Sequence, residues 1–309
     1  MELLRLFESI RNPVLDALML GITEFGGATL FIAIGLLMFW CVDKRQGYFL
    51  LTVGLAGTFL NQLLKIACRV PRPWVKDPDF TIVEAARADA GGYSFPSGHS
   101  QVAVGTYGGL ALCRRETWIR VICTVLAVLV PVSRMYLGVH TPADVVVGGL
   151  CALVLAVPLW MSFSRVGTAP RLMVPVLAGT AVLGLTLLGY VSFYPFPPDL
   201  DTDNYAEAVK NACSLLGVTL GLAVTWIFDE TYLHFPVAAP LWGQVVKLGV
   251  GIALVLCILE GSKPLLALLA GAAPWTHFVR YLLATLFAGV VWPMTFRLYQ
   301  RFRIAKERK

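Results

Sequence analysis

The stretch from Val121 to Trp160, "VICTVLAVLVPVSRMYLGVHTPADVVVGGLCALVLAVPLW", decides the fold class. It consists of two apolar runs separated by a short turn that carries an arginine, a histidine and an aspartate. Each run approaches the length of about 20 residues that a helix needs to cross a hydrocarbon core of about 30 Å. The runs lack the alternation of a barrel strand, and backbone polar groups cannot stay unpaired in lipid. The stretch therefore predicts two membrane-spanning helices.

The composition of the whole chain extends this prediction. Of 309 residues, 57% are hydrophobic and 14% are charged, whereas about 25% are charged in a soluble globular domain. The apolar runs between charged or Pro/Gly-rich breaks predict nine spans, at residues 20–41, 47–67, 97–113, 118–135, 142–162, 171–192, 208–228, 242–262 and 276–297. We therefore expect an all-α fold, a polytopic transmembrane helix bundle.

One break in composition divides the chain, at "SFYPFPPDLDTDNYAE", residues 192–207. It separates residues 1–192, which contain six predicted spans, from residues 193–309, an extension of three spans whose role the sequence does not indicate. The first residues, "MELLRLFESIRNP", predict an amphipathic interfacial helix. They carry two glutamates and no small-residue cleavage pattern, so we expect no removable signal peptide.

Cysteine usage and charge argue against two other classes of protein. The seven cysteines are odd in number and mostly lie inside apolar runs, so neither a disulfide framework nor a Cys-x-x-Cys metal site is expected. The net charge is +6, but six of the 25 basic residues crowd into the tail from Arg297 to Lys309. Such a tail is typical of a cytoplasmic membrane-edge anchor, and no nucleic-acid partner is expected.

The basic residues also predict the orientation. Alternate loops fall on two faces, and one face collects Lys44, Arg45, Arg114, Arg115, Arg120, Arg165, Arg171 and the basic tail. The positive-inside rule makes that face cytoplasmic, with the acidic turn at 229–230 as the exception. We expect a multi-pass plasma-membrane protein with its N-terminus outside and its C-terminus in the cytoplasm.

Ionisable residues at membrane helix ends are costly unless they snorkel, pair or have a function. Six of them fall at the opposite, non-cytoplasmic face, from four separate helix ends: Lys65, Arg72, His99, Arg134, His140 and Asp144. The three cations offer fixed positive charge and donors suited to a phosphate or another tetrahedral oxyanion. The pattern indicates an anion site.

The stretch "YSFPSGHS", residues 93–100, adds donors to this site. Ser97 and Gly98 precede a helix whose first amide groups have no internal partner, and glycine lets the backbone approach a ligand closely. Pro96 to His99 therefore predict an anion-binding helix start.

His140 and Asp144 are spaced i, i+4, so both lie on one helical face. The carboxylate can accept from one ring nitrogen and leave the other as a lone-pair nucleophile, which is the orienting logic of a catalytic triad. His99 can then act as the general acid for the leaving oxygen. No matching cluster of carboxylates and histidines is present to bind a cation, so we expect phosphoryl transfer without a metal or cofactor.

Three motifs now stand in order: "KIACRVPRP" from Lys65 to Pro73 fits K-x6-R-P, Pro96 to His99 fit P-S-G-H, and "SRMYLGVHTPAD" from Ser133 to Asp144 fits S-R-x5-H-x3-D. In these motifs the chain resembles the type 2 phosphatidic acid phosphatase superfamily. That superfamily includes lipid phosphate phosphatases, undecaprenyl pyrophosphate phosphatases, glucose-6-phosphatase and vanadium haloperoxidases. The resemblance covers roughly residues 20–192, so it implies that residues 1–192 are a membrane phosphatase core.

The resemblance also implies residue roles. His140 would attack phosphorus to form a phosphohistidine, Asp144 would orient it, and His99 would protonate the leaving group and then activate water. The phosphoryl oxygens would be held by Lys65, Arg72, Arg134, Ser97 and Gly98, with Ser133 as a weaker candidate.

The expected function is that of an integral membrane phosphatase that hydrolyses a lipid phosphate or lipid diphosphate at the non-cytoplasmic face. A phosphorylated lipid would be its substrate and membrane lipids its surroundings. Three alternatives stay open: a phospho-sugar phosphatase similar to glucose-6-phosphatase, a lipid phosphotransferase, and a catalytically silent lipid-phosphate transporter or binding protein. The sequence does not indicate an oligomeric state.

Overall fold

The computed structural model describes residues 1–163, 169–197, 200–271 and 273–299. Every regular element in these ranges is helical, which confirms the predicted all-α class. The first half of the chain forms α1 (Glu2–Ser9), α2 (Pro13–Glu24), α3 (Ala28–Leu37), α4 (Lys44–Cys68), α5 (Pro73–Lys76), α6 (Gly98–Ala103), α7 (Gly109–Cys113) and α8 (Thr117–Tyr136). The second half forms α9 (Pro142–Phe163), α10 (Ala169–Phe193), α11 (Thr202–Phe228), α12 (Leu241–Ala270), α13 (Trp275–Leu286) and α14 (Trp292–Met294).

Within the described ranges, seven helices are long and apolar enough to cross a membrane. A bent pair, Pro13–Glu24 with Ala28–Val42, would make an eighth if it counts as one span. The predicted span at 97–113 coincides with α6, a π-helical turn at Val104–Gly108, and α7. All nine predicted ranges thus fall on helical segments.

The first predicted span, 20–41, differs from the structure in its shape. Its helix begins earlier, at Pro13, where the side chain of Asn12 accepts hydrogen bonds from the first amide groups of α2. It then bends by 46° before α3. Gly26 lies at the bend, and a Cβ there would be only 2.6 Å from Val130 Cγ1 and 3.1 Å from the carbonyl oxygen of His99. Close packing at this glycine accompanies the break.

The chain divides into two compact units that do not follow chain order. Unit one comprises Met1–Ile32, Phe49–Val166 and Val191–Ala208, and unit two comprises Ala33–Tyr48, Gly167–Tyr190 and Val209–Lys309. The division of the sequence at residue 192 rests on composition and remains a prediction. Arg165 and residues 300–309, which contributed to the predicted orientation, lie outside the described residues.

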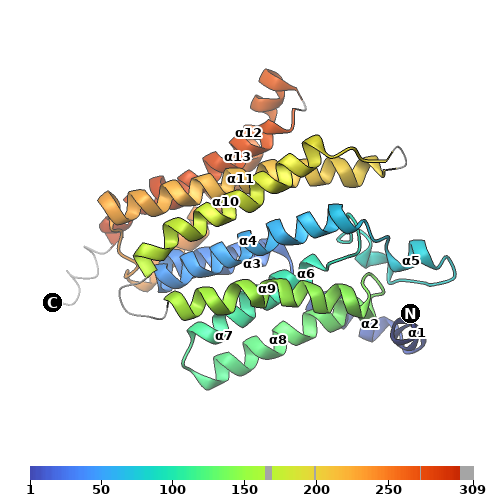
Figure 1. Cartoon of the computed structure of the whole chain (residues 1–309). Helices are drawn as coiled ribbons and strands as arrows, with labels where there is room; N and C mark the ends of the chain where they lie inside the picture. The colour runs from blue at the N-terminus through green and yellow to red at the C-terminus, as the bar shows by residue number, and fades with distance from the viewer. Residues whose placement is uncertain (164–168, 198–199, 272, 300–309) are drawn as a thin grey trace. The chain divides into compact units, whose positions relative to one another are not determined.

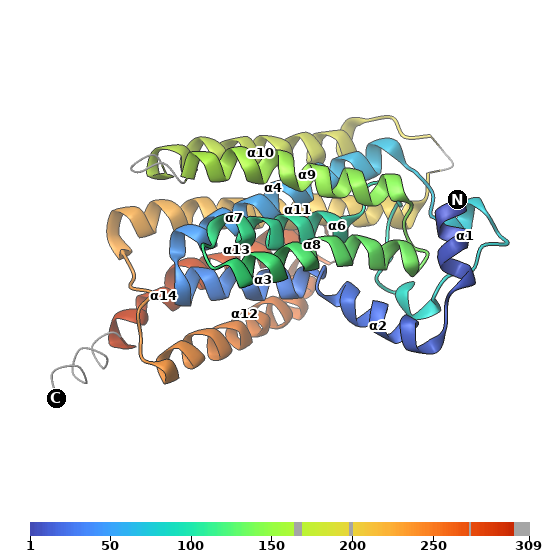
Figure 2. The same cartoon turned by 90° about the horizontal axis from the view of Figure 1, so that it is seen from below.

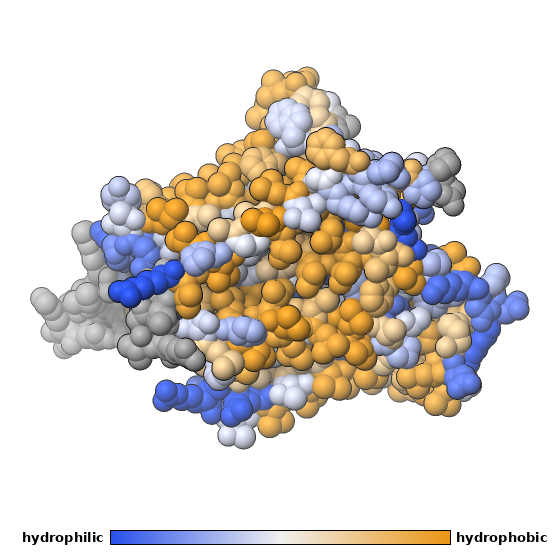
Figure 3. Space-filling view, in the orientation of Figure 1, coloured by the Kyte–Doolittle hydropathy of each residue, from blue (hydrophilic) through white to orange (hydrophobic). Residues whose placement is uncertain are grey.

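In unit one, α6 packs against α8 and α9, and both α1 and α2 pack against α8. Figures 1 and 2 show these helices and the loop that carries α5. Exposed apolar side chains follow α9 at Val146, Leu150, Leu153, Val154, Val157 and Met161. Figure 3 shows hydrophobic side chains over α9 and hydrophilic ones gathered around α1 and α5. The outer surface of this helix is suited to lipid.

Helix α1 is anchored to the loop after α5. Arg5 forms ion pairs with Glu8 at 2.9 Å and with Asp77 at 2.7 Å. Arg11, just after α1, donates to the carbonyl oxygens of Tyr136 at 3.0 Å and Thr81 at 2.8 Å. These contacts hold the N-terminal helix beside the end of α8; its interfacial position remains a prediction.

Two buried charged side chains of unit two have hydrogen-bonding partners. Lys44 forms an ion pair with Asp229 at 2.9 Å, and Asp229 is fully buried. Lys247 donates to the carbonyl of Val237 at 2.8 Å. The acidic turn at 229–230 was the exception to the positive-inside pattern. One of its carboxylates, Asp229, is neutralised by Lys44.

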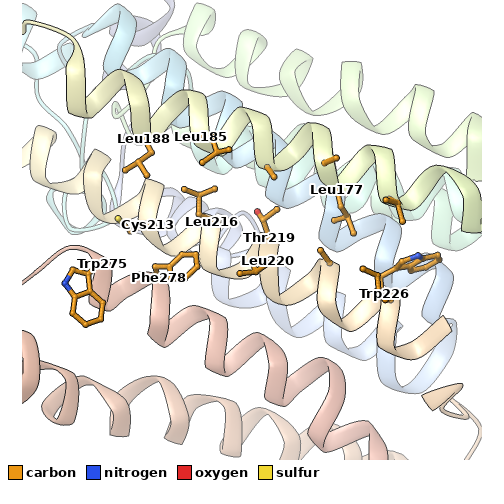
Figure 4. Close-up of a pocket in the computed structure, with 15 residues that line it drawn as sticks. Leu177, Leu185, Leu188, Cys213, Leu216, Thr219, Leu220, Trp226, Trp275 and Phe278 are labelled. Atoms are coloured by element: carbon orange, nitrogen blue, oxygen red, sulfur yellow. The ribbon is translucent and has the colours of Figure 1, made fainter. Parts of the chain in front are cut away.

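A hollow of about 550 Å³ lies in unit two between α10, α11 and α13 (Figure 4). Its lining is aliphatic and aromatic, apart from the hydroxyl of Thr219 and the thiol of Cys213. Such a lining suits a hydrocarbon chain and supplies no charge for a phosphate.

Candidate active site

The eight predicted site residues all lie in unit one, at the meeting point of several helix ends. Lys65 is near the end of α4, and Arg72 immediately precedes α5. The start of α6 carries Ser97, Gly98 and His99, the last turn of α8 carries Arg134, and the turn into α9 carries His140 and Asp144. Lys65 lies within electrostatic range of Arg72, Arg134 and Asp144, so residues distant in sequence share one site.

The turn between α8 and α9 is built around Gly138. This glycine has a φ of 82°, in the left-handed region, and a Cβ on it would lie 2.7 Å from Arg11 Nη2. Its amide donates to Met135, and the next amide, of Val139, donates to Arg134 at 3.2 Å. This is how a glycine ends a helix, and it brings His140 directly to the start of α9.

Asp144 closes a capping box at the start of α9. The amide of Thr141 donates to Asp144 Oδ2 at 2.8 Å, and the amide of Asp144 approaches Thr141 Oγ1 at 3.3 Å. Sequence reasoning missed this second role of Asp144, although Thr-x-x-Asp before an apolar run is a recognisable capping signal. The cap fixes the carboxylate one turn from His140.

The carboxylate of Asp144 lies between His140 and Ser94. Its Oδ2 atom is 3.5 Å from His140 Nδ1, at the limit of hydrogen-bond range, and accepts from Ser94 Oγ at 2.6 Å. Ser94 is fully buried, and its amide donates to the carbonyl of Val70. No sequence signal marks Ser94, because it lies in an irregular loop with no periodicity to place it.

Arg72 defines the tautomer of His140. Its Nη1 atom is 2.9 Å from His140 Nε2 and 3.0 Å from the carbonyl oxygen of Val139. A guanidinium has no acceptor atom, so Nε2 must present a lone pair, and the ring proton of a neutral imidazole must lie on Nδ1, toward Asp144. This tautomer puts the available lone pair of the ring on Nε2, where it accepts from the guanidinium of Arg72.

The neighbours of His140 favour its neutral form. Burial is the main reason why the pKa of the His140 imidazole lies well below its ordinary value, and the opposing influence of Asp144 is smaller. The positive charges of Arg72, Arg134 and Lys65 lower this pKa further. The imidazole therefore keeps its lone pair under neutral conditions.

The three cations have neutral hydrogen-bond partners. Lys65 donates to the carbonyl of Tyr93, and Arg72 Nε donates to the carbonyl of Gly92 at 3.0 Å. The guanidinium of Arg134 is fully buried, with Nη1 donating to Thr23 Oγ1 at 3.0 Å and Nη2 to the carbonyl of Asp89 at 3.3 Å. Carbonyls and a hydroxyl orient these groups without cancelling their charge, so the site is suited to an anion.

The Pro-Ser-Gly-His segment is locked against α9. Ser97 caps α6, accepting from the amide of Ser100 at 3.3 Å, and its own amide donates to the carbonyl of Asp144 at 2.9 Å. A Cβ at Gly148 of α9 would lie 2.4 Å from the carbonyl oxygen of Ser97, so only glycine permits this approach. The amides of Gly98 and His99 follow the cap, where no helical carbonyl precedes them.

The His99 imidazole has a different environment. Arg134, Arg72 and Lys65 lie within electrostatic range of it, and it makes no hydrogen bond to any residue that the structure describes. Ser133, the weaker candidate, donates its hydroxyl to the carbonyl of Val130 at 2.7 Å, within its own helix. His99 thus offers ring nitrogens to a ligand, whereas the hydroxyl of Ser133 is already engaged.

Comparison with known proteins places this geometry in a family. The profile described as "PAP2 superfamily" matches residues 45–167, and that described as "PAP2 superfamily phosphatase, transmembrane extension" matches residues 213–306. Phosphatidylglycerophosphatase B of Bacillus subtilis is 34% identical over 161 residues, covering 47% of this chain and 74% of the relative. Undecaprenyl-diphosphatase BcrC of the same organism is 32% identical over 161 residues, covering 51% of this chain and 77% of the relative.

Among solved structures, a PAP2-type phosphatidylglycerolphosphate phosphatase from Bacillus subtilis matches with 31% identity and a TM-score of 0.43, covering 51% of this chain and 81% of that one. The helices and the sequence matches define a membrane phosphatase. The chain belongs to the PAP2 superfamily, which confirms the expected resemblance.

Proposed function

We propose that the protein removes phosphate from a lipid phosphate or lipid diphosphate through a phosphohistidine on His140, at the non-cytoplasmic face of the plasma membrane. The observation that carries the proposal is the line of contacts from Arg72 through His140 to Asp144. Lipid substrates are supported by relatives named as a phosphatidylglycerophosphatase and undecaprenyl-diphosphatases.

In the first step, the lone pair of His140 Nε2 attacks phosphorus. A P–N bond forms and the P–O bond to the lipid breaks. His99, kept protonated by the bound phosphate against the three cations around it, gives its proton to the leaving oxygen. Arg72 Nη1 donates to Nε2 at 2.9 Å, so it turns this hydrogen bond to a phosphoryl oxygen as the substrate binds, which frees the lone pair for attack. The carboxylate of Asp144 stabilises the positive charge that develops on the imidazole.

In the second step, water attacks the phosphohistidine. His99, now neutral, accepts a proton from this water, an O–P bond forms and the P–N bond breaks. Inorganic phosphate leaves, and His140 and His99 return to their starting states. The phosphoryl oxygens are held in both steps by Lys65, Arg72, Arg134, the hydroxyl of Ser97 and the amide of Gly98. These groups place hydrogen-bond donors and positive charge where negative charge develops on the phosphoryl oxygens. The proposed reaction therefore needs no metal ion.

The distribution of arginines supports the proposed face. Arg114 and Arg115 precede α8 and Arg120 lies in its first turns, whereas Arg134 and the site lie at its other end. Basic residues at the site end are partly paired with carboxylates, as Arg87 is with Glu84 at 2.8 Å. The positive-inside rule then puts the site outside and the start of α8 in the cytoplasm.

The decisive experiment measures phosphate release by the purified protein in detergent with EDTA. The panel consists of phosphatidate, phosphatidylglycerophosphate, a prenyl diphosphate, a sphingoid phosphate and a sugar phosphate. We expect turnover of at least one lipid and an acid-labile phosphoryl label on the wild-type protein. His140→Ala should lose both, while His277→Ala, outside the site, should keep both.

Several results would contradict parts of the proposal. Turnover by His140→Ala would refute the nucleophile, and a strict requirement for added magnesium would refute the metal-free mechanism. Hydrolysis of the sugar phosphate alone would favour the phospho-sugar alternative, and a phosphorylated product on added alcohol would identify a phosphotransferase. Tight binding of lipid phosphate without turnover would favour a silent binding protein.

A further inference from the structure

The segment that links α10 to α11 belongs to the same compact unit as the active site. Residues 191–208 fall in unit one, yet they lie between the two family matches, which end at residue 167 and resume at residue 213. The hydroxyl of Tyr205 donates to the carbonyl of Val191 at 2.9 Å, and Arg69 lies over the ring of Phe196 at 5.7 Å. The segment is therefore a feature of this chain that the family's motifs do not describe.

This segment and the end of α4 enclose a small polar hollow beside the site. Side chains of Gln62 and Lys65 line it from α4, and those of Asn204 and Glu207 line it from α11. Gly92, Ile66, Tyr93 and Ala208 form the rest of the wall. The carbonyl of Gly92 accepts from Arg72. Lys65 thus belongs both to the hollow and to the phosphate site, so a ligand in the hollow would lie next to the bound phosphate.

Three polar side chains of the hollow have no hydrogen-bond partner among the described residues. The side chains of Gln62, Asn204 and Glu207 are half-buried and make no hydrogen bond to any residue in the described part of the chain. Glu207 Oε2 lies against the backbone of Gly91 and Gly92, 3.3 and 3.4 Å from where a Cβ on each would be. The two amides can donate to a hydroxyl oxygen, and the carboxylate can accept from the hydroxyl proton, so this set of side chains can bind a hydroxyl group.

Size and charge define what fits. The cavity volume of the hollow is about 10 Å³, which is room for roughly one water-sized group. A hydroxyl has this size, whereas a phosphate does not. The carboxylate of Glu207 also repels a second anionic phosphate. It lies close enough to Lys65 and Arg72 to interact electrostatically with both.

We propose that Glu207, with Asn204 and Gln62, forms a hydroxyl-binding subsite that selects lipid phosphomonoesters whose headgroup carries a hydroxyl beside the phosphate, and that disfavours diphosphates. The proposal rests on the proposed phosphatase function and adds the substrate class to it. The hydroxyl donates its proton to Glu207 in a hydrogen bond, and Asn204 or Gln62 donates to the hydroxyl oxygen.

Three lipids test the subsite. Phosphatidylglycerophosphate carries a hydroxyl on the carbon next to its terminal phosphate ester. In phosphatidate the oxygen on that neighbouring carbon is acylated, and a prenyl diphosphate has no such hydroxyl but carries a second phosphate on the first. The measurement is kcat/KM for each lipid with the full-length wild-type protein, with Glu207→Gln and with Asp203→Asn. Asp203 is an exposed carboxylate in the first turn of α11, one turn before Glu207, and does not line the hollow.

For Glu207→Gln we expect kcat/KM for phosphatidylglycerophosphate to fall about tenfold relative to phosphatidate, the effect of replacing one charged hydrogen-bond acceptor by a neutral one. For the same variant, kcat/KM for the prenyl diphosphate should rise relative to phosphatidate, because the negative charge of Glu207 no longer repels the second phosphate. Asp203→Asn should leave both ratios unchanged.

An equal change for all three lipids would show that Glu207 acts only through the charge of Lys65, and would overturn the subsite. The same shift in ratios for Asp203→Asn would overturn it too. A wild-type protein that turns over none of the lipids would contradict the phosphatase proposal instead, so the two failures are distinguishable.

Discussion

Both compact units bury charged side chains, but they satisfy them differently. In unit two, the buried carboxylate of Asp229 has its own lysine, Lys44, at 2.9 Å. In unit one, two buried arginines and the half-buried Lys65 have no carboxylate in direct contact among the described residues, and the capped carboxylate of Asp144 lies against a histidine. A buried charge with a dedicated opposite charge stabilises a fold, whereas a group of like charges held by carbonyls is costly until an anion arrives. The difference separates a region whose charges are matched from the one in which we propose catalysis.

The sharpest test of this comparison replaces the two buried aspartates by asparagine. Asp144→Asn should lower kcat by about 10³–10⁴-fold, because the amide no longer holds the tautomer of His140 or stabilises its positive charge. Asp229→Asn should leave kcat per folded molecule unchanged. The measurement is phosphate release under saturating lipid, normalised to folded protein.

Thermal unfolding of the same two variants should show the reverse order. Asp229→Asn removes the partner of Lys44, and a broken buried pair costs about 3 kcal/mol, the lower end of the usual range, since Lys44 is partly exposed. Asp144→Asn keeps its shape and its capping geometry, so its unfolding midpoint should fall less. Equal losses of activity in both variants would remove the distinction between the two units.

A second test compares two fully buried cations. Arg134 bridges Thr23 and the carbonyl of Asp89 through two separate nitrogens, which a lysine ammonium cannot do. Arg134→Lys should therefore lower kcat/KM by about 10²-fold, the usual size of losing one preorganised donor in a catalytic site. Lys247, by contrast, has one carbonyl partner, on Val237, and lies 4.3 Å from the ring centroid of Phe296.

Lys247→Met supplies the matched control, because methionine fills a similar volume without a buried charge. Its kcat/KM should equal that of the wild type. A loss comparable to that of Arg134→Lys would mean that buried positive charge in unit two also serves the reaction, and the comparison between the units would be wrong.

The sequence could predict the helices and the meeting of their ends, because long apolar runs fix where each span stops. Lys65, His99, Arg134 and His140 all lie within a turn of such an end, so their common location followed from hydropathy alone. The i, i+4 spacing was enough to place Asp144 next to His140. Their catalytic roles remain predictions.

Other parts of the site could not be predicted from the sequence. Ser94 reaches Asp144 from an irregular loop, where no periodicity gives a side chain its direction. Glu207 lies far along the chain from Lys65 and approaches it only through tertiary packing of a segment between two spans. The bend of the first span depends on Gly26, whose close neighbours, Val130 and His99, come from other helices.

Ser94 gives the smallest expected effect and the finest test of the comparison. Its hydroxyl donates to Asp144 Oδ2 at 2.6 Å, while the amide of Thr141 continues to hold that oxygen when Ser94 is replaced. Ser94→Ala should lower kcat by about tenfold with little change in KM, since one hydrogen bond to a charged group is lost without removing a phosphate donor. Ser214→Ala is the matched control in unit two, where a buried serine donates to the carbonyl of Lys210 within its own helix. Unchanged kcat for Ser94→Ala would show that the capping box alone positions Asp144, and a raised KM would place Ser94 among the groups that bind the substrate. We expect kcat to fall for Ser94→Ala and to stay unchanged for Ser214→Ala. This result would extend the distinction between the units from full charges to a single hydroxyl.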